Sequence, residues 1–261
     1  MQTKWKIRMG ALGVLAAAAA MAAGSSPAMA AASGHGAGVS VRTATAHAVH
    51  HGAHSIQTSS NWSGYAETGS GYTSIAGDWT VPTSKGKGGN KYQAEWLGID
   101  GDGNQHLIQT GTQVDESGGS ASYGAWWEIL PAAETPINEP VSPGDQIEAS
   151  IVKQSSGKWL ITLEDVGRWT FTITKSYSGP GASAEWIVEA PEVGGSIASM
   201  NHTSKVTFDD LTVNGANPEL VYATDAIACK QDKKIVESPS EPTGGNSFAM
   251  AYGAKTPKAP A

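Results

Sequence analysis

The 261-residue sequence predicts an all-β fold in which two antiparallel sheets pack face to face as a sandwich. From residue 59 to residue 253 the chain consists of short segments rich in Trp, Tyr, Val, Ile and Thr, separated by Gly, Pro, Asn, Asp and Ser. No stretch after residue 60 keeps the period of 3.6 residues that marks an amphipathic helix. The length suits one large β domain plus removable segments, because sandwiches of about 200 residues often stay undivided.

The clearest predicted element is a hairpin between Lys158 and Lys175. Large apolar side chains occupy alternate positions of residues 159–163 and again of residues 169–173, and Glu-Asp-Val-Gly lies between the two runs. Such a pattern is typical of two antiparallel strands joined by a tight turn. A further turn, Pro143-Gly144-Asp145, precedes a strand that we expect over residues 146–152.

The first 30 residues have the pattern of a secretory signal peptide. Three basic residues precede an apolar, Ala-rich stretch from Met9 to Ala23, and Ala28-Met29-Ala30 matches an A-x-A cleavage site. The apolar stretch is shorter than the roughly 20 residues that a membrane-spanning helix needs. We therefore expect a secreted, extracellular protein with no membrane contact after the signal is removed.

Residues 31–58 are predicted to be a propeptide or linker. They consist mainly of Ala, Gly, Ser and His, so they cannot bury enough apolar surface to fold alone. Five of the seven histidines of the chain lie here, which fits a solvated linker, a pH-sensitive propeptide or a metal site: His35, His47, His50, His51 and His54. At the other end, residues 254–261 are predicted to be a disordered tail.

The charge of the predicted domain argues against a nucleic-acid partner. Four of the 17 basic residues and none of the 24 acidic residues precede residue 60, which leaves 13 basic against 24 acidic side chains and a formal charge of −11. Such a surface repels phosphate backbones and suits an acidic medium, where protonation lowers its charge. The single cysteine, Cys229, excludes an internal disulfide and is interpreted as a buried thiol, since no basic partner lies near it in the sequence.

Several common hydrolase designs leave no trace in this sequence. It contains no D-T-G or D-S-G, no G-x-S-x-G and no H-E-x-x-H. Only His106 and His202 remain in the predicted domain, and neither has a recognisable triad or zinc-site context. We therefore expect no metal and no cofactor.

Four strand-like segments each bring large polar side chains to one face. Successive residues of a strand point to opposite faces, so each segment combines a polar face with a strongly apolar one that anchors it in a core. The segments 94–100, 106–113, 125–130 and 184–190 carry on their polar faces Trp96 and Asp100, Gln109 and Gln113, Trp126 and Glu128, and Glu185 and Glu189, respectively. A surface lined by Glu, Gln and Trp is a plausible binding site.

The same segments, taken in order, resemble the landmark motifs of the glutamic peptidase (eqolisin) family. The motifs are N-W-S-G from Asn61, W-L-G-I-D-G-D from Trp96, L-I-Q-T-G from Leu107, A-W-W-E from Ala125 and A-E-W-I-V-E from Ala184. Five ordered motifs across some 150 residues are far more specific than any one of them.

The resemblance implies a function and a site. The Gln of the I-Q-T-G segment and the second Glu of the A-E-W-I-V-E segment form the family's catalytic dyad, which here means Gln109 and Glu189. The family also implies a lectin-like (concanavalin A-like jelly roll) double sheet, a signal and propeptide, no metal, and acid activity. We accordingly expect an endopeptidase that acts on polypeptides, interacts with its own propeptide and is a monomer.

The sequence departs from the better-known fungal members in three ways. Gln113 stands where they have an acidic residue, Ile129-Leu130-Pro131 stands where they have aromatic residues before the proline, and their disulfides are absent. These differences leave the dyad intact and concern substrate preference and the acidity of the pH optimum.

Under this hypothesis Glu189 takes a proton from water and returns it to the leaving amine, while the Gln109 side-chain N–H stabilises the oxyanion. Trp62 and Trp96 are expected to shape the substrate site. Asp100 and Glu128 are expected to orient the dyad or contact the substrate.

Two other functions remain open at this point. A glycoside hydrolase on the same kind of sandwich would use Glu128 and Glu189 as its acid and nucleophile. A non-catalytic sugar-binding module would use the tryptophans alone. Gln109 discriminates between the three, because a glycosidase has no need of it.

Overall fold

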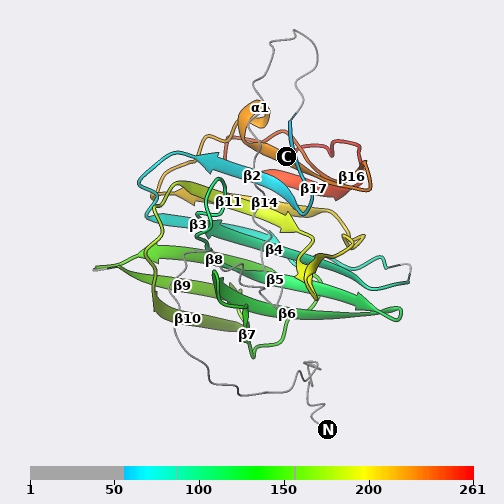
Figure 1. Cartoon of the computed structure of the whole chain (residues 1–261), viewed down its shortest axis with the longest axis horizontal. Helices are drawn as coiled ribbons and strands as arrows, with labels where there is room; N and C mark the ends of the chain where they lie inside the picture. The colour runs from blue at the N-terminus through cyan, green and yellow to red at the C-terminus, as the bar shows by residue number, and fades with distance from the viewer. Residues whose placement is uncertain (1–55, 87, 156) are drawn as a thin grey trace, which may run out of the picture. The chain divides into compact units, whose positions relative to one another are not determined.

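The computed structural model describes residues 56–261 except residues 87 and 156 (Figure 1). The predicted signal peptide and the predicted propeptide up to residue 55 lie outside the described residues. Among the residues described, no helix is long and apolar enough to cross a membrane.

The described residues form strands almost throughout, and the helix α1 (Tyr222–Asp225) has only four residues. The strands are β1 (Gln57–Ser59), β2 (Trp62–Thr68), β3 (Ser74–Thr80), β4 (Lys91–Ile99), β5 (Ile108–Ser117), β6 (Ser120–Ile129), β7 (Thr135–Ile137), β8 (Gln146–Lys153), β9 (Lys158–Asp165), β10 (Trp169–Ser176), β11 (Ser183–Glu189), β12 (Glu192–Val193), β13 (Ser196–Ile197), β14 (Val206–Val213), β15 (Ala226–Gln231), β16 (Lys234–Pro239) and β17 (Phe248–Tyr252).

Hydrogen bonds connect most of these strands in one path, in the order β10-β9-β8-β3-β14-β17-β16-β15-β2-β11-β4-β5-β6-β7. Neighbours along this path are antiparallel, whereas β1 pairs with β15 in parallel. The short strands β12 and β13 form a separate two-stranded ribbon directly after β11.

Two hydrogen bonds show that the path folds back on itself into two layers. The Trp79 indole of β3 donates to Thr112 Oγ1 of β5 at 2.9 Å, and the Trp186 indole of β11 donates to the Ala76 carbonyl of β3 at 3.0 Å. Both bonds join strands that are far apart in the hydrogen-bonded order. The predicted double-sheet sandwich is therefore confirmed.

A single large apolar core fills the space between the layers. Leu97 and Ile99 of β4 lie in it, as do Trp186 and Val188 of β11, all with no exposed surface. These are the faces that the alternation of residues predicted to be apolar. Their burial anchors both strands and turns the alternate side chains of β4 and β11 to the other face.

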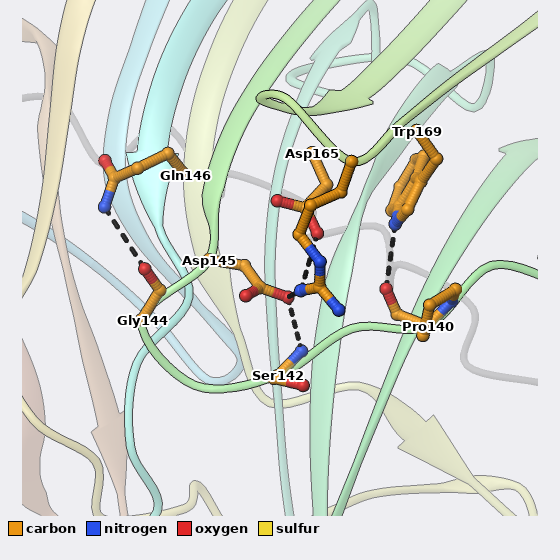
Figure 2. Close-up of polar contacts among 8 residues, drawn as sticks. Pro140, Ser142, Gly144, Asp145, Gln146, Asp165 and Trp169 are labelled. Carbon is orange, nitrogen blue, oxygen red and sulfur yellow. Dashed lines mark hydrogen bonds and ion pairs between the residues drawn. The ribbon is translucent and has the colours of Figure 1, made fainter.

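The predicted hairpin over residues 158–175 is confirmed as β9 and β10, with Trp169 opposite Asp165 across the turn. Figure 2 shows how this turn is held to the segment before β8. The Arg168 guanidinium lies 2.5 Å from a carboxylate oxygen of Asp145 and 2.9 Å from one of Asp165. The Trp169 indole donates to the Pro140 carbonyl at 2.8 Å. These contacts tie two turns together at one end of the outer strands.

The last residues make contacts that the prediction of a disordered tail did not include. The Thr243 hydroxyl donates to the Pro260 carbonyl at 2.8 Å, and the Tyr222 and Thr256 hydroxyls are 3.5 Å apart. Two prolines in the tail, Pro257 and Pro260, lower the entropy that the chain loses when it is held in one conformation.

Candidate active site

Strands β2, β11, β4, β5 and β6 lie side by side, and their registers bring the predicted site residues to one face. Glu189 of β11 is opposite Trp62 of β2 and Ala94 of β4. Gln109 of β5 is opposite Gly98 of β4 and Glu128 of β6. We call this side the polar face, defined by five of the predicted site residues: Trp62, Trp96, Gln109, Glu128 and Glu189.

Glu189 lies near the end of β11 and is 2% exposed. Its two carboxylate oxygens accept hydrogen bonds from different elements. Asn61 Nδ2, just before β2, donates to Oε1 at 3.0 Å, and the Trp96 indole of β4 donates to Oε2 at 2.9 Å. A buried carboxylate that accepts one side-chain donor on each oxygen is held in a defined orientation, with its charge partly compensated.

Gln109 forms a direct pair with Glu128 across β5 and β6. Its Nε2 donates to Glu128 Oε2 at 2.5 Å, and both side chains are almost fully buried. Among the residues that the structure describes, Gln109 Oε1 has no hydrogen-bond partner. The carboxylate therefore sets which end of the Gln109 amide faces β6.

Tryptophan rings fill the area between these two pairs. Trp62 and Trp96 meet edge to face with ring centroids 5.1 Å apart. Gly111 makes room for this arrangement, because a Cβ at that position would lie 2.6 Å from Trp96 Cβ. Within the described part of the chain, the indole N–H groups of Trp62 and Trp126 are buried without a partner, and such groups in native structures call for an explanation.

The dyad residues are separated by strand β4 and by the Trp96 side chain. Glu189 is opposite Ala94 of β4 and Gln109 is opposite Gly98. Both side chains therefore project from the same face, but at different positions along the strands. Each is held by its own partners, Glu189 by Asn61 and Gln109 by Glu128. The sequence placed both residues on one face correctly, but it did not indicate these separate supports.

Asp100 lies at the end of β4 with a φ of 67°, and its contacts face a different segment. Its carboxylate accepts hydrogen bonds from the Tyr177 hydroxyl at 2.6 Å and from the backbone N–H groups of Gly181 and Ala182 at 3.0 and 2.8 Å. Asn104 Nδ2 is a fourth donor at 3.4 Å. These bonds make Asp100 the anchor of residues 177–182, which lead into β11.

Glu185 shares the face of Glu189 but lies four residues away at the other end of β11. The Asp102 backbone N–H donates to its Oε1 at 3.4 Å. Burial raises the pKa of the Glu185 carboxyl well above its usual range, and the nearby charges of Asp102 and Asp100 raise it further. In acid Glu185 is therefore neutral.

Cys229 is fully buried on β15, and its thiol donates to the Ser60 carbonyl at 3.5 Å. Burial raises the pKa of this thiol far above its usual range, and Glu237 and Glu189 add to the effect. A thiol that stays protonated is a poor nucleophile. Across residues 56–261, apart from 87 and 156, no three His, Cys, Asp or Glu side chains are grouped as a metal site would require.

Comparison with known proteins identifies the family of this chain. The model of the Peptidase A4 family matches residues 60–252. Aspergillopepsin-2 of Aspergillus niger is 30% identical over 223 residues, an alignment that covers 74% of this chain and 78% of the relative. The chain belongs to the Peptidase A4 family.

Solved structures of Peptidase A4 relatives have the same fold. A scytalido-glutamic peptidase bound to a transition state analog inhibitor superposes with a TM-score of 0.63 at 23% identity, covering 74% of this chain and 98% of the other. The aspergilloglutamic peptidase from Aspergillus niger gives a TM-score of 0.53 at 27% identity, covering 62% and 99%.

Membership of the Peptidase A4 family confirms the resemblance to glutamic peptidases that the five motifs indicated. The chain is a glutamic-type endopeptidase and therefore a hydrolase. The alternatives of a glycoside hydrolase and of a silent sugar-binding module are accordingly set aside.

Proposed function

We propose that this chain is a secreted acid endopeptidase in which Glu189 activates water and Gln109 stabilises the oxyanion. The observation that carries the proposal is the placement of both side chains on one buried polar face, each oriented by its own hydrogen bonds. Catalytic groups need this kind of fixed orientation, since a small misplacement costs much of the rate.

Glu189 has the properties of a general base. Its two oxygens accept from Asn61 and Trp96, and hydrogen bonds to a carboxylate favour its charged form. Even an unperturbed glutamate, with a pKa of about 4.3, is partly ionised in mild acid. Glu189 would accept the proton of the attacking water and then deliver it to the departing amine nitrogen, which balances the hydrolysis.

Gln109 supplies an uncharged donor that survives in acid. Its amide carries two N–H groups, and the hydrogen bond to Glu128 occupies one of them. The other is left to meet the oxyanion that forms as water adds to the scissile carbonyl. A donor in this role typically contributes about 3 kcal/mol to transition-state stabilisation.

The unpaired polar atoms around the dyad fit a peptide substrate. The indole N–H groups of Trp62 and Trp126 can donate to backbone carbonyls, and Gln109 Oε1 can accept from a backbone N–H. A bound peptide offers both kinds of group at every residue, so it would satisfy these atoms. We assign Trp62 and Trp126 to the substrate site on this basis, and Trp96 and Glu128 because they contact the two dyad residues.

Secretion and maturation follow from the terminal segments and the charge. The signal-like residues 1–30 direct export, and the His-rich segment between them and strand β1 forms a propeptide that interacts with the acidic domain. Acid protonates these histidines and lowers the charge of −11 on the remaining chain. Both changes favour a protein that becomes active after export into acid.

The dyad is tested by kinetics of two variants on an uncharged fluorogenic peptide in acid. Glu189→Gln keeps the size of the side chain and should abolish activity. Gln109→Ala should lower kcat by about a hundredfold or more, with little change in KM. Gln146→Ala is the control, because it removes an exposed strand amide on β8, outside the polar face, and it should leave kcat and KM within a few fold of wild type. A folded Glu189→Gln or Gln109→Ala protein with wild-type kcat would refute the Gln/Glu mechanism.

A further inference from the structure

The side chain of Asn61 donates to Glu189 in a way that the surrounding residues enforce. An indole nitrogen can only donate a hydrogen bond, so Trp96 must be the donor to Glu189. An asparagine amide could instead present either its nitrogen as a donor or its oxygen as an acceptor. The environment of the Asn61 amide therefore decides whether Glu189 receives a second donor.

Ser59 settles that choice. Its Oγ accepts the backbone N–H groups of Asn61 and Trp62 at 3.3 and 3.1 Å, and its single proton points to Asn61 Oδ1 at 3.0 Å. With Oδ1 occupied as an acceptor, Nδ2 faces Glu189. Ser59, Asn61 and Glu189 are all buried, so water does not compete for these bonds.

The segment that carries Ser59 and Asn61 is held by β15 as well as at the end of β11, where the Ala190 N–H donates to the Asn61 carbonyl at 2.9 Å. Strand β1 runs parallel to β15 with Ser59 opposite Cys229, and Gln231 Nε2 donates to the Ser60 carbonyl at 3.3 Å. Backbone contacts on both sides therefore fix where the Asn61 side chain begins, next to the end of β11 that carries Glu189.

We propose that Asn61, oriented by Ser59, is a positioning residue that fixes the Glu189 carboxylate and keeps it ionised in acid. The inference rests on the proposed role of Glu189 as the general base. It names a residue that would set how far into acid the enzyme works, because the base must lose its proton before it can activate water.

Several ionisable groups lie on the strands around Glu189, and Glu128 on the same face accepts from Gln109 Nε2. Cys229 faces it from β15, and Glu237 of β16 lies beyond that cysteine. Burial raises the pKa of both groups well above their usual ranges, so both are neutral in acid. On β4 the neighbouring position is Ala94, and the carboxyl of Glu95 points to the opposite face. The hydrogen bonds that Glu189 accepts from Asn61 and Trp96 favour its charged form.

The test is the pH profile of kcat/KM on an uncharged peptide, whose acidic limb reports the base of the free enzyme. Removing a hydrogen bond to a charged group should move that limb of Asn61→Ala to higher pH by about one unit or more. Asn61→Asp should move it further, because an ionised neighbour disfavours the Glu189 charge. Ser59→Ala should give a smaller shift in the same direction, and Ser59→Thr, which restores the hydroxyl, should reverse it.

Asn201→Ala separates positioning from simple support. Asn201 is also a fully buried asparagine, and its amide donates to Ser84 Oγ at 3.1 Å in another part of the domain. Its loss should lower the melting temperature without moving the acidic limb. If Asn61→Ala does not fold, Ser59→Ala carries the test alone.

If folded Asn61→Ala has the same acidic limb as wild type, the positioning role is wrong. The same conclusion follows from an unmoved limb in Ser59→Ala if Asn61→Ala does not fold. Activity of Glu189→Gln distinguishes this result from a failure of the underlying mechanism. An inactive Glu189→Gln with an unmoved limb leaves Glu189 as the base and removes only Asn61. An active Glu189→Gln removes both.

Discussion

The two faces of the β2-β11-β4-β5-β6 layer both carry a buried carboxyl group, and the two carboxyls accept hydrogen bonds from different kinds of donor. On the polar face Glu189 accepts a donor on each oxygen, from Asn61 and Trp96. On the core face Glu95 accepts from one amide at 2.7 Å and one hydroxyl at 3.2 Å. Burial nevertheless outweighs these bonds and raises the pKa of Glu95 to about 7.

Strand β16, outside this layer, holds a second buried carboxyl that has even less support. Glu237 of β16 is almost fully buried, and its Oε2 has no hydrogen-bond partner among the described residues. Burial raises its pKa well above the usual range, and the charge of Glu95 raises it further. The sheet thus holds Glu189, which the proposed mechanism requires to be ionised, together with carboxyls whose raised pKa favours the protonated form. Environment, not residue type, separates their roles.

The largest effect that we expect from this contrast is a loss of stability as the pH rises. Folding raises the pKa of Glu95 from 4.5 to about 7, so the folded state binds the proton more tightly than the unfolded state does. The resulting stabilisation is complete below pH 4.5 and is lost as the pH rises through 7. For Glu95 alone the free energy of unfolding should fall by about 3 kcal/mol between pH 4 and pH 8. The raised pKa of Glu237 lowers the free energy of unfolding further as the pH rises.

Urea unfolding of wild type, Glu95→Gln and Glu139→Gln at several pH values measures this fall. The slope of the free energy against pH is the readout, because an exchange of oxygen for nitrogen also changes the local hydrogen bonds by a constant amount. Glu95→Gln should flatten the slope, whereas Glu139→Gln, at an exposed position, should leave it unchanged. Equal slopes in all three proteins would show that the core face does not hold protonated carboxyls.

A smaller effect on stability is expected at Asp100. Its carboxylate accepts four hydrogen bonds, mainly from residues 177–182, and so holds that loop in place. Asn tolerates a positive φ, so Asp100→Asn changes the hydrogen bonds without adding backbone strain. It should lower the free energy of unfolding by about 2 kcal/mol and leave KM within a few fold of wild type. Tyr177→Phe, which removes one of the donors, should cost about half as much. If Asp100→Asn raises KM strongly without lowering stability, Asp100 contacts the substrate, as the sequence predicted.

Much of this layer could be predicted from local sequence. Alternation along segments such as 94–100 and 184–190 assigned the polar and apolar faces correctly, because a strand has a period of two and one face must be buried. The hairpin at residues 158–175 was equally accessible, since both strands and the turn are adjacent in the chain. The order of the strands was not, because pairs such as β14 with β17 or β2 with β15 depend on packing between distant segments.

The supports of the site were the least predictable part. Asn61 lies 128 residues before Glu189, and a short polar residue at the start of a strand is also typical of a turn. It stands inside the N-W-S-G motif, so the only signal was its position beside Trp62. Asp100 was expected on the polar face by alternation, but β4 ends at Ile99 and the positive φ of Asp100 turns its carboxylate to the 177–182 loop.

The smallest effect is expected for Glu185→Gln, which checks the contrast between Glu189 and the carboxyls that are neutral in acid. Glu185 lies on the same strand and face as Glu189, but its Oε2 has no partner among the described residues, and its raised pKa keeps it neutral in acid. A neutral carboxyl resembles the amide of Gln in size and charge, so kcat and KM in acid should stay within a few fold of wild type.

Above neutral pH the Glu185→Gln variant should be the more stable protein, because it has no carboxyl to ionise at that position. Kinetics of Glu185→Gln beside Glu189→Gln, with thermal melting at pH 4 and pH 8, measure both points. If Glu185→Gln loses activity and Glu189→Gln keeps it, the two glutamates have exchanged the roles assigned to them here.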